Sequence, residues 1–143
     1  MNGWLVAAAV LVVAGLGPSL WGVARGGAGR RVVAQNTATL LLCLVFLLLS
    51  QGYGRPSYTD LALVTSVLGP TGTLVFVRLL GDEIDAPPPG LHLLTPLVAV
   101  GTPATLVPLC VATGPGRALL KLLLIGALLM AGGIVTSKAL RHA

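Results

Sequence analysis

Charged side chains are scarce in this sequence of 143 residues, and acidic ones are the scarcest. Nine basic and four acidic residues make up 9% of the chain, whereas 55% of it is hydrophobic and the mean hydropathy is +0.95. So little polar surface cannot cover a soluble domain, so the sequence predicts an all-α integral membrane protein. Aromatic residues make up only 4%, and the basic residues are scattered singly or in pairs, so a nucleic-acid partner is not expected.

Residues that carry catalysis or bind metals are also few. Cys43 and Cys110 lie inside apolar runs, where a free cysteine usually packs as a small hydrophobe. The two histidines and the cysteines have no metal-ligand spacing, and no pair of carboxylates lies in or beside an apolar segment. We therefore expect no enzyme activity, no cofactor and no metal site.

Apolar segments of membrane-spanning length recur along the chain, since a helix needs about 20 apolar residues to cross a bilayer. Five are expected, at about residues 3–23, 32–51, 58–80, 91–113 and 117–137. With five spans, six basic residues fall on one side and three on the other. The six are Arg25, Arg30, Arg31, Arg78, Lys138 and Arg141. The excess predicts an outside N-terminus and a cytoplasmic C-terminus. If the proline-rich fourth segment were re-entrant, the C-terminus would lie on the other side.

The segment 58–80 is the most informative, because an acid stands near one end and a base near the other. Asp60 and Arg78 are about five turns apart and project from one face. Small residues on roughly the opposite face predict close packing of a second helix. They are Thr65, Gly69, Gly72 and Thr73, and a similar set in the last span includes Gly126 and Gly133.

Ionisable groups inside the membrane are what a self-contained antiporter requires, and this chain offers almost none. Asp60 is the only carboxylate beside a span. In the second span Asn36, Thr39 and Cys43 share a helical face and are expected to contact another helix, whereas His92 near a boundary is a candidate for proton relay. The candidate ion-path residues are therefore Asp60, Asn36 and His92. With so few ionisable groups, the chain is expected to pack against other subunits.

The third span resembles the F-type component of the Mrp (Mnh) multisubunit sodium/proton antiporters. That family's third helix has the form D-x-A-L-x-x-x-x-x-G-x-x-G-T and ends in arginine. The matching residues here are Asp60, Ala62, Leu63, Gly69, Gly72, Thr73 and Arg78. The family's second-helix motif is matched in part, by residues 31–34 and Thr37, with Arg30 and Asn36 at its two acidic positions.

The C-terminal part resembles the G-type component of the same complex. LHLLTP at 91–96 is similar to that family's L-H-x-x-T-K, and LLKLLLIG at 119–126 is similar to its final helix. The two resemblances imply an F/G fusion, with an F-like region 1–81, an acidic, proline-rich loop 82–90 and a G-like region 91–143. They also imply an accessory subunit in a bacterial cell membrane, beside antiporter-like partner subunits, near a path for sodium ions and protons.

Two alternatives remain open from the sequence. One is a stand-alone small membrane transporter that acts as a homodimer, and the other is a purely structural subunit of a related proton-translocating complex. The loss of acids at Arg30 and Asn36 favours a structural role, because a cation path there depends on negative charge.

Overall fold

The computed structural model describes the backbone of residues 2–83 and 91–141, and the side chains of these residues except 91–95, 97, 98, 140 and 141. All the regular structure within those ranges is helical. The elements are α1 (Gly3–Leu11), the π-turn η1 (Val12–Leu16), α2 (Gly17–Ala24), α3 (Ala28–Tyr53), α4 (Ser57–Leu79), the short 3-10 turn η2 (Gly81–Glu83), α5 (Leu91–Thr113) and α6 (Arg117–Arg141). The all-helical prediction is confirmed.

Four helices of the described chain are long and apolar enough to cross a membrane. They are Gly3–Ala24, Ala28–Tyr53, Ser57–Leu79 and Arg117–Ala139. The fourth predicted segment coincides with α5, but the apolar stretch found in its described part, Ala99–Thr113, is shorter. Four of the five expected spans are therefore identified as candidates. The remaining one, the fourth along the chain at α5, stays a prediction.

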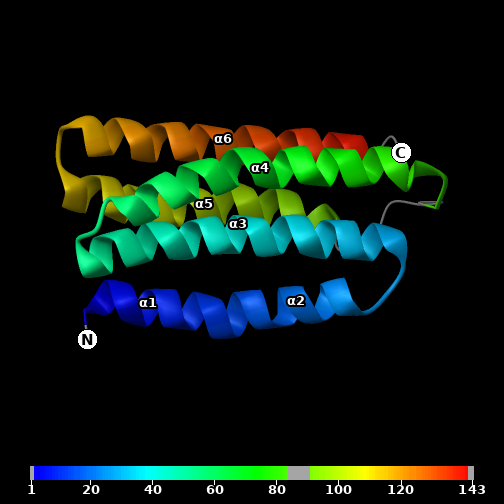
Figure 1. Cartoon of the computed structure of the whole chain (residues 1–143), viewed down its shortest axis with the longest axis horizontal. Helices are drawn as coiled ribbons and strands as arrows, with labels where there is room; N and C mark the ends of the chain where they lie inside the picture. Colours follow the sequence, from blue (N-terminus) through cyan, green and yellow to red (C-terminus); the bar gives the residue numbers. More distant parts are fainter. Residues whose placement is uncertain (1, 84–90, 142–143) are drawn as a thin grey trace.

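The helices lie side by side as one bundle, with α3 at its centre (Figure 1). α3 packs against α1 and α2 on one side, α4 on the other and α5 behind, while α6 packs against both α4 and α5. Successive long helices alternate in direction, so that α4 and α6 are parallel neighbours. The two termini lie at opposite ends of the bundle (Figure 1).

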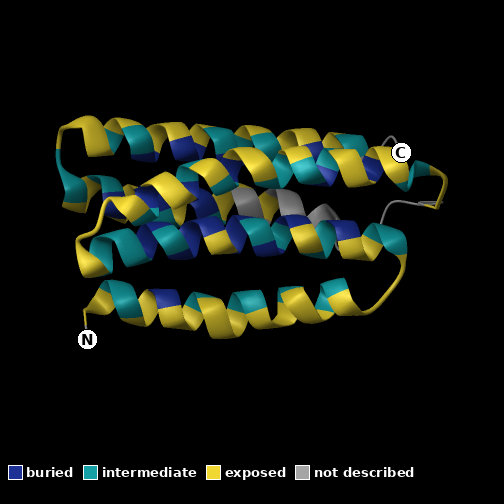
Figure 2. Ribbon diagram, in the orientation of Figure 1, coloured by how far each residue is buried: buried dark blue, intermediate teal, exposed yellow. Residues whose placement is uncertain are grey.

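Burial follows this arrangement. The largest group of buried side chains belongs to α3, including Cys43, Leu44 and Leu47, and it joins Leu109 of α5 and Ile125 of α6 in one core. By contrast, α1 and α2 expose most of their surface (Figure 2). Because α3 contacts helices on several sides, it holds the core, while the first span contacts α3 along one face only.

Glycine residues end α3 and α5, and glycine and proline accompany the π-turn in the first span. Gly54 ends α3 and Gly114 follows α5, each in the left-handed conformation that a residue without Cβ adopts most easily (φ 63° and 71°). Within the first span the π-turn η1 ends at Leu16, two residues before Pro18, whose missing N–H and bulky ring disturb a regular α-helix. The sequence of this span, with Gly15, Gly17 and Pro18 near one end, thus produces a change of helix type.

Candidate functional site

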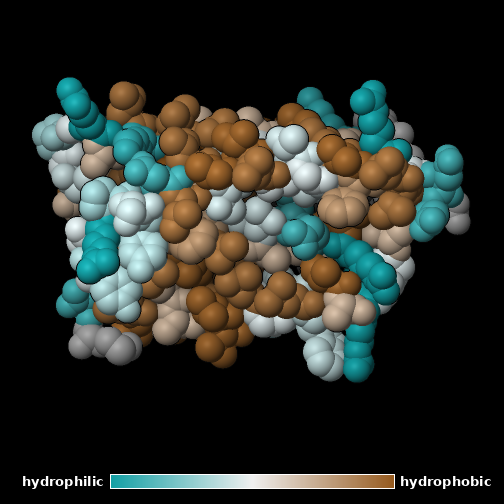
Figure 3. Space-filling model, viewed as in Figure 1, coloured by the Kyte–Doolittle hydropathy of each residue, from teal (hydrophilic) through white to brown (hydrophobic). Residues whose placement is uncertain are grey.

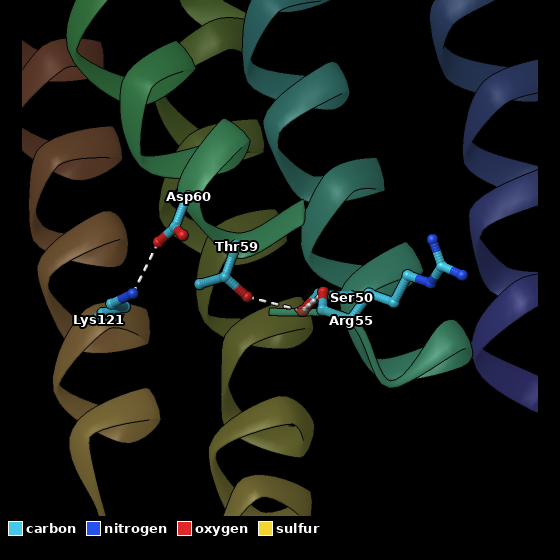
Figure 4. A network of polar contacts seen from close by, with 5 residues as sticks. All are labelled: Ser50, Arg55, Thr59, Asp60 and Lys121. Carbon is cyan, nitrogen blue, oxygen red and sulfur yellow. Dashed lines mark hydrogen bonds and ion pairs between the residues drawn. The ribbon is translucent and has the colours of Figure 1, made fainter. Parts of the chain in front are cut away.

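Asp60 forms an ion pair with a base that lies in another helix. It stands in the first turn of α4, where the helix dipole favours negative charge, and its Oδ1 accepts a hydrogen bond of 2.7 Å from Lys121 Nζ in α6 (Figure 4). The Asp60 side chain is 59% exposed and that of Lys121 44%. Such a pair at the end of the bundle, partly open to water, stabilises it by about 1 kcal/mol or less.

A second group of polar contacts surrounds the turn between α3 and α4. The hydroxyls of Ser50 and Thr59 are 2.7 Å apart, and Ser50 Oγ also donates to the carbonyl of Arg55 at 3.1 Å (Figure 4). Gln51 Nε2 donates to Thr113 Oγ1 of α5 at 2.8 Å. These side chains border a cavity of about 200 Å³. They fasten α3, α4 and α5 together at the same end as the ion pair.

The polar face of α3 contacts another helix, as its spacing predicts, and that helix is α4. Asn36 is 4% exposed, and its Oδ1 lies 3.5 Å from Thr73 Oγ1, a long contact for a hydrogen bond. Thr73 Oγ1 makes a better bond, of 3.0 Å, to the carbonyl of Gly69 in its own helix. Cys43 Sγ donates to the carbonyl of Ala62 at 3.2 Å. These contacts hold α3 and α4 together without an ionised group.

The small residues of α4 differ in what they contact. A Cβ placed on Gly69 would collide with the methyl group of Thr39 in α3, whereas one on Gly72 would have no neighbour within 4 Å. Thr65, on the same face, is half-buried, and its hydroxyl donates to the carbonyl of Leu61 at 2.8 Å. The close approach of α3 therefore depends on Gly69 and not on Gly72.

On α6 the glycines meet two different helices. A Cβ on Gly126 would lie 2.6 Å from Leu106 Cδ1 of α5, and one on Gly132 would collide with the ring of Pro70 in α4. Gly133 is buried beside a small cavity that Asn36 also lines. The sequence pattern singles out Gly126 and Gly133, and Gly132 adds the contact that joins α6 to α4.

The candidate ion-path residues are not gathered at one place. Asp60 lies in the first turn of α4, whereas Asn36 contacts Thr73, thirteen residues or about 20 Å further along that helix. The side chain of His92 lies outside the described residues. The described contacts therefore include no continuous polar path between Asp60 and Asn36.

Basic residues occupy both ends of the bundle, with more at the end where α2 and α4 finish. Arg25, Arg30, Arg31, Arg78 and Lys138 are exposed near the helix ends there, and the side chain of Arg141 lies outside the described residues. The guanidinium of Arg25 stacks over the Trp21 ring at 4.1 Å, a cation–π contact. Arg55, Arg117 and Lys121 belong to the opposite end. Which end faces the cytoplasm stays a prediction.

Sequence reasoning missed the partner of Asp60. Lys121 is one of the three bases predicted on the same side of the membrane as the start of α4, and that shared side is the signal that could have paired it with Asp60. The hydroxyls of Ser50 and Thr59 carry no comparable signal, because isolated serines and threonines are common at the ends of membrane helices. Their pairing depends on the shape of the α3–α4 turn.

Comparison with known protein families gives a match to the helix pair described above. Residues 30–81 match the MrpF / PhaF family model, described as multiple resistance and pH regulation protein F. The matched region comprises nearly all of α3, all of α4 and the intervening turn, and so includes Asn36, Asp60 and Gly69. No curated protein and no solved structure matches the chain. The helices α5 and α6 lie outside the MrpF match.

Proposed function

We propose that this chain is a small accessory subunit of a multisubunit monovalent cation (sodium)/proton antiporter in the cell membrane. The observation that carries the proposal is the match of residues 30–81 to the MrpF family model. The four candidate membrane spans support a multi-pass protein. In this proposal antiporter-like partner subunits carry the main proton path, and this chain packs beside them.

The charges of the bundle favour a packing role over a direct ionic one. Asp60, the only carboxylate inside a candidate span of the described chain, is paired with Lys121 at the end of the bundle. A group that exchanges ions away from bulk water needs a deeper position and a free charge. We therefore assign Asp60 to holding α4 against α6, and regard Asn36 as a helix-contact residue with Thr73.

The C-terminal helices are proposed to be the G-like part of a fused subunit, with region 1–81 F-like, 82–90 a connector and 91–143 G-like. Two contacts between α4 and α6 support a tight association of the two parts. One is the Asp60–Lys121 ion pair, and the other is the approach of Gly132 to Pro70. The orientation that goes with five spans is an outside N-terminus and a cytoplasmic C-terminus.

Copurification tests the proposed function directly. The full chain is tagged at its own chromosomal locus, expressed in its native cells and extracted in mild detergent. It is expected to copurify with several large membrane subunits. A second tagged small membrane protein from the same cells serves as the control for nonspecific capture. Recovery of a stable chain without partners would contradict the proposal and would favour a stand-alone transporter.

A transport assay separates the packing role from the ionic one. In vesicles that contain the assembled complex, Asp60→Asn is expected to leave sodium-coupled proton movement within about twofold of the parent, because only a surface ion pair is lost. Abolished transport with intact assembly would show that Asp60 belongs to the ion path.

A further inference from the structure

A groove runs along the outer face of the bundle between α3 and α4. It consists of two adjoining hollows, of about 240 Å³ and 380 Å³, that share Gln35 and Phe76 in their walls. The smaller reaches inward to Thr65, and the larger reaches the end of α4 at Leu80, so the groove is about 22 Å long at 1.5 Å per helical residue. Figure 3 shows this face, where paler and teal surface interrupts the brown over the middle of the bundle.

The charge of the groove is confined to its outer end. Arg31 lines the larger hollow next to the basic connector, and among the described residues it has no ion-pair partner. Asp82 and Glu83 follow α4 at the same end, but neither lines the groove. Gln35 lies one turn further in. A positive group thus sits at one end of the groove, followed by an amide.

The inner part of the groove requires no polar partner. Gly69 and Gly72 form part of its floor, and Leu68 and Phe76 stand exposed beside it. The hydroxyls of Thr65 and Thr73 already donate to carbonyls of their own helix. This part of the groove therefore suits a flexible apolar chain.

We propose that the groove binds an anionic phospholipid. Its phosphate lies at Arg31, its ester region at Gln35, and one acyl chain extends over Gly72 toward Thr65. A guanidinium recognises phosphate through paired hydrogen bonds, and anionic lipid headgroups are attracted to basic groups near a membrane surface. An apolar helix of a partner protein fits less well, because it would leave the Arg31 guanidinium without a partner.

Lipid retention tests this site, and it does so independently of the proposed function. The full chain, with any subunits that copurify, is reconstituted in nanodiscs of equal parts phosphatidylglycerol and phosphatidylcholine. It is then released into mild detergent and weighed by native mass spectrometry. The parent is expected to retain phosphatidylglycerol preferentially. Arg31→Gln is expected to reduce that preference about fivefold, the effect of one basic residue near an anionic surface, and Arg31→Lys to keep most of it.

Two further variants separate headgroup from chain binding. Arg117→Gln removes an exposed base at the opposite end and is expected to change nothing. Gly72→Leu places a bulky side chain in the groove at a position where an added Cβ has no neighbour within 4 Å, so it should reduce retention of both lipids. Gly101→Leu in α5, where an added Cβ also has no neighbour within 4 Å, should not. Equal retention of the two lipids by the parent, an equal loss with Arg117→Gln, or unchanged retention with Gly72→Leu would overturn the proposal. So would a photo-crosslinker at position 72 that captures a partner's peptide and no lipid.

Discussion

Alanine is expected to destabilise the protein at one glycine of α4 and not at another. Gly69 faces Thr39 so closely that an added Cβ collides with its methyl group, whereas Gly72, three residues later, faces open space. The two positions share one helix, one residue type and one substitution. They differ only in whether α3 approaches, so Gly72→Ala is the matched control for Gly69→Ala.

The expected magnitudes follow from two opposing effects. Alanine is favoured over glycine within a helix by about 0.5–1 kcal/mol. Overpacking at a tight contact costs about 1–3 kcal/mol. At Gly69 both effects act, so we expect a net destabilisation of about 0.5–2 kcal/mol. At Gly72 only the first acts, so alanine there is expected to be neutral or to stabilise by up to about 1 kcal/mol.

A double-mutant cycle then identifies the contact. Thr39→Ser removes the methyl group that collides and keeps the hydroxyl that donates to the carbonyl of Gln35. In the Thr39→Ser background, Gly69→Ala should lose at least half of its cost, while Gly72→Ala should be unaffected. Unfolding of the purified chain in detergent, followed by circular dichroism against denaturant, measures each difference. Equal effects of the two alanines, or no coupling between positions 39 and 69, would refute this account of the α3–α4 contact.

Other contacts give further expectations by the same unfolding assay. Gly132→Ala should destabilise by about 0.5–2 kcal/mol, because its Cβ meets the Pro70 ring and the helix preference for alanine offsets part of that cost. The cost of Gly132→Ala should be smaller in a Pro70→Ala background; an unchanged stability would rule out this α4–α6 contact. Reversing the charge at Asp60 by Asp60→Lys should lower the stability by about 1 kcal/mol or less, and this cost should disappear in high salt. Adding Lys121→Asp should restore the stability. A cost that high salt leaves unchanged would argue against an exposed ion pair. Thr59→Val should cost about 1 kcal/mol through loss of its bond with Ser50, with Thr71→Val as the exposed control.

The sequence predicted where the helices lie along the chain better than it predicted which helices contact one another. Hydropathy placed α4, α5 and α6 within a residue of their observed starts, because membrane-length apolar runs end at glycine, proline and charged residues. The spacing of Asn36 and Cys43 correctly predicted a face that meets another helix, and the observed partner is α4. Periodicity gives the face of a helix, but not which helix covers it.

At the candidate site, too, the sequence identifies the important residues but not the residues they contact. Asp60 stands out in the sequence as an acid inside a membrane-length apolar segment. Its pairing with Lys121 depends on α4 and α6 lying parallel, which no local pattern encodes. Gly69 and Gly72 are alike in the sequence, since both lie on the small face of α4. The structure separates them, because residues three apart point about 60° away from each other and α3 covers only one of them.

The parallel pairing of α4 with α6 has a consequence for synthesis. Lys121 is 61 residues downstream of Asp60, so at about 5–20 residues per second it leaves the ribosome about 3–12 s later. During that interval α4 can already pack against α3, while its other face has no partner from its own chain. The order of translation therefore favours completion of the α3–α4 pair first, and the face around Pro70 is the last part of α4 to be covered.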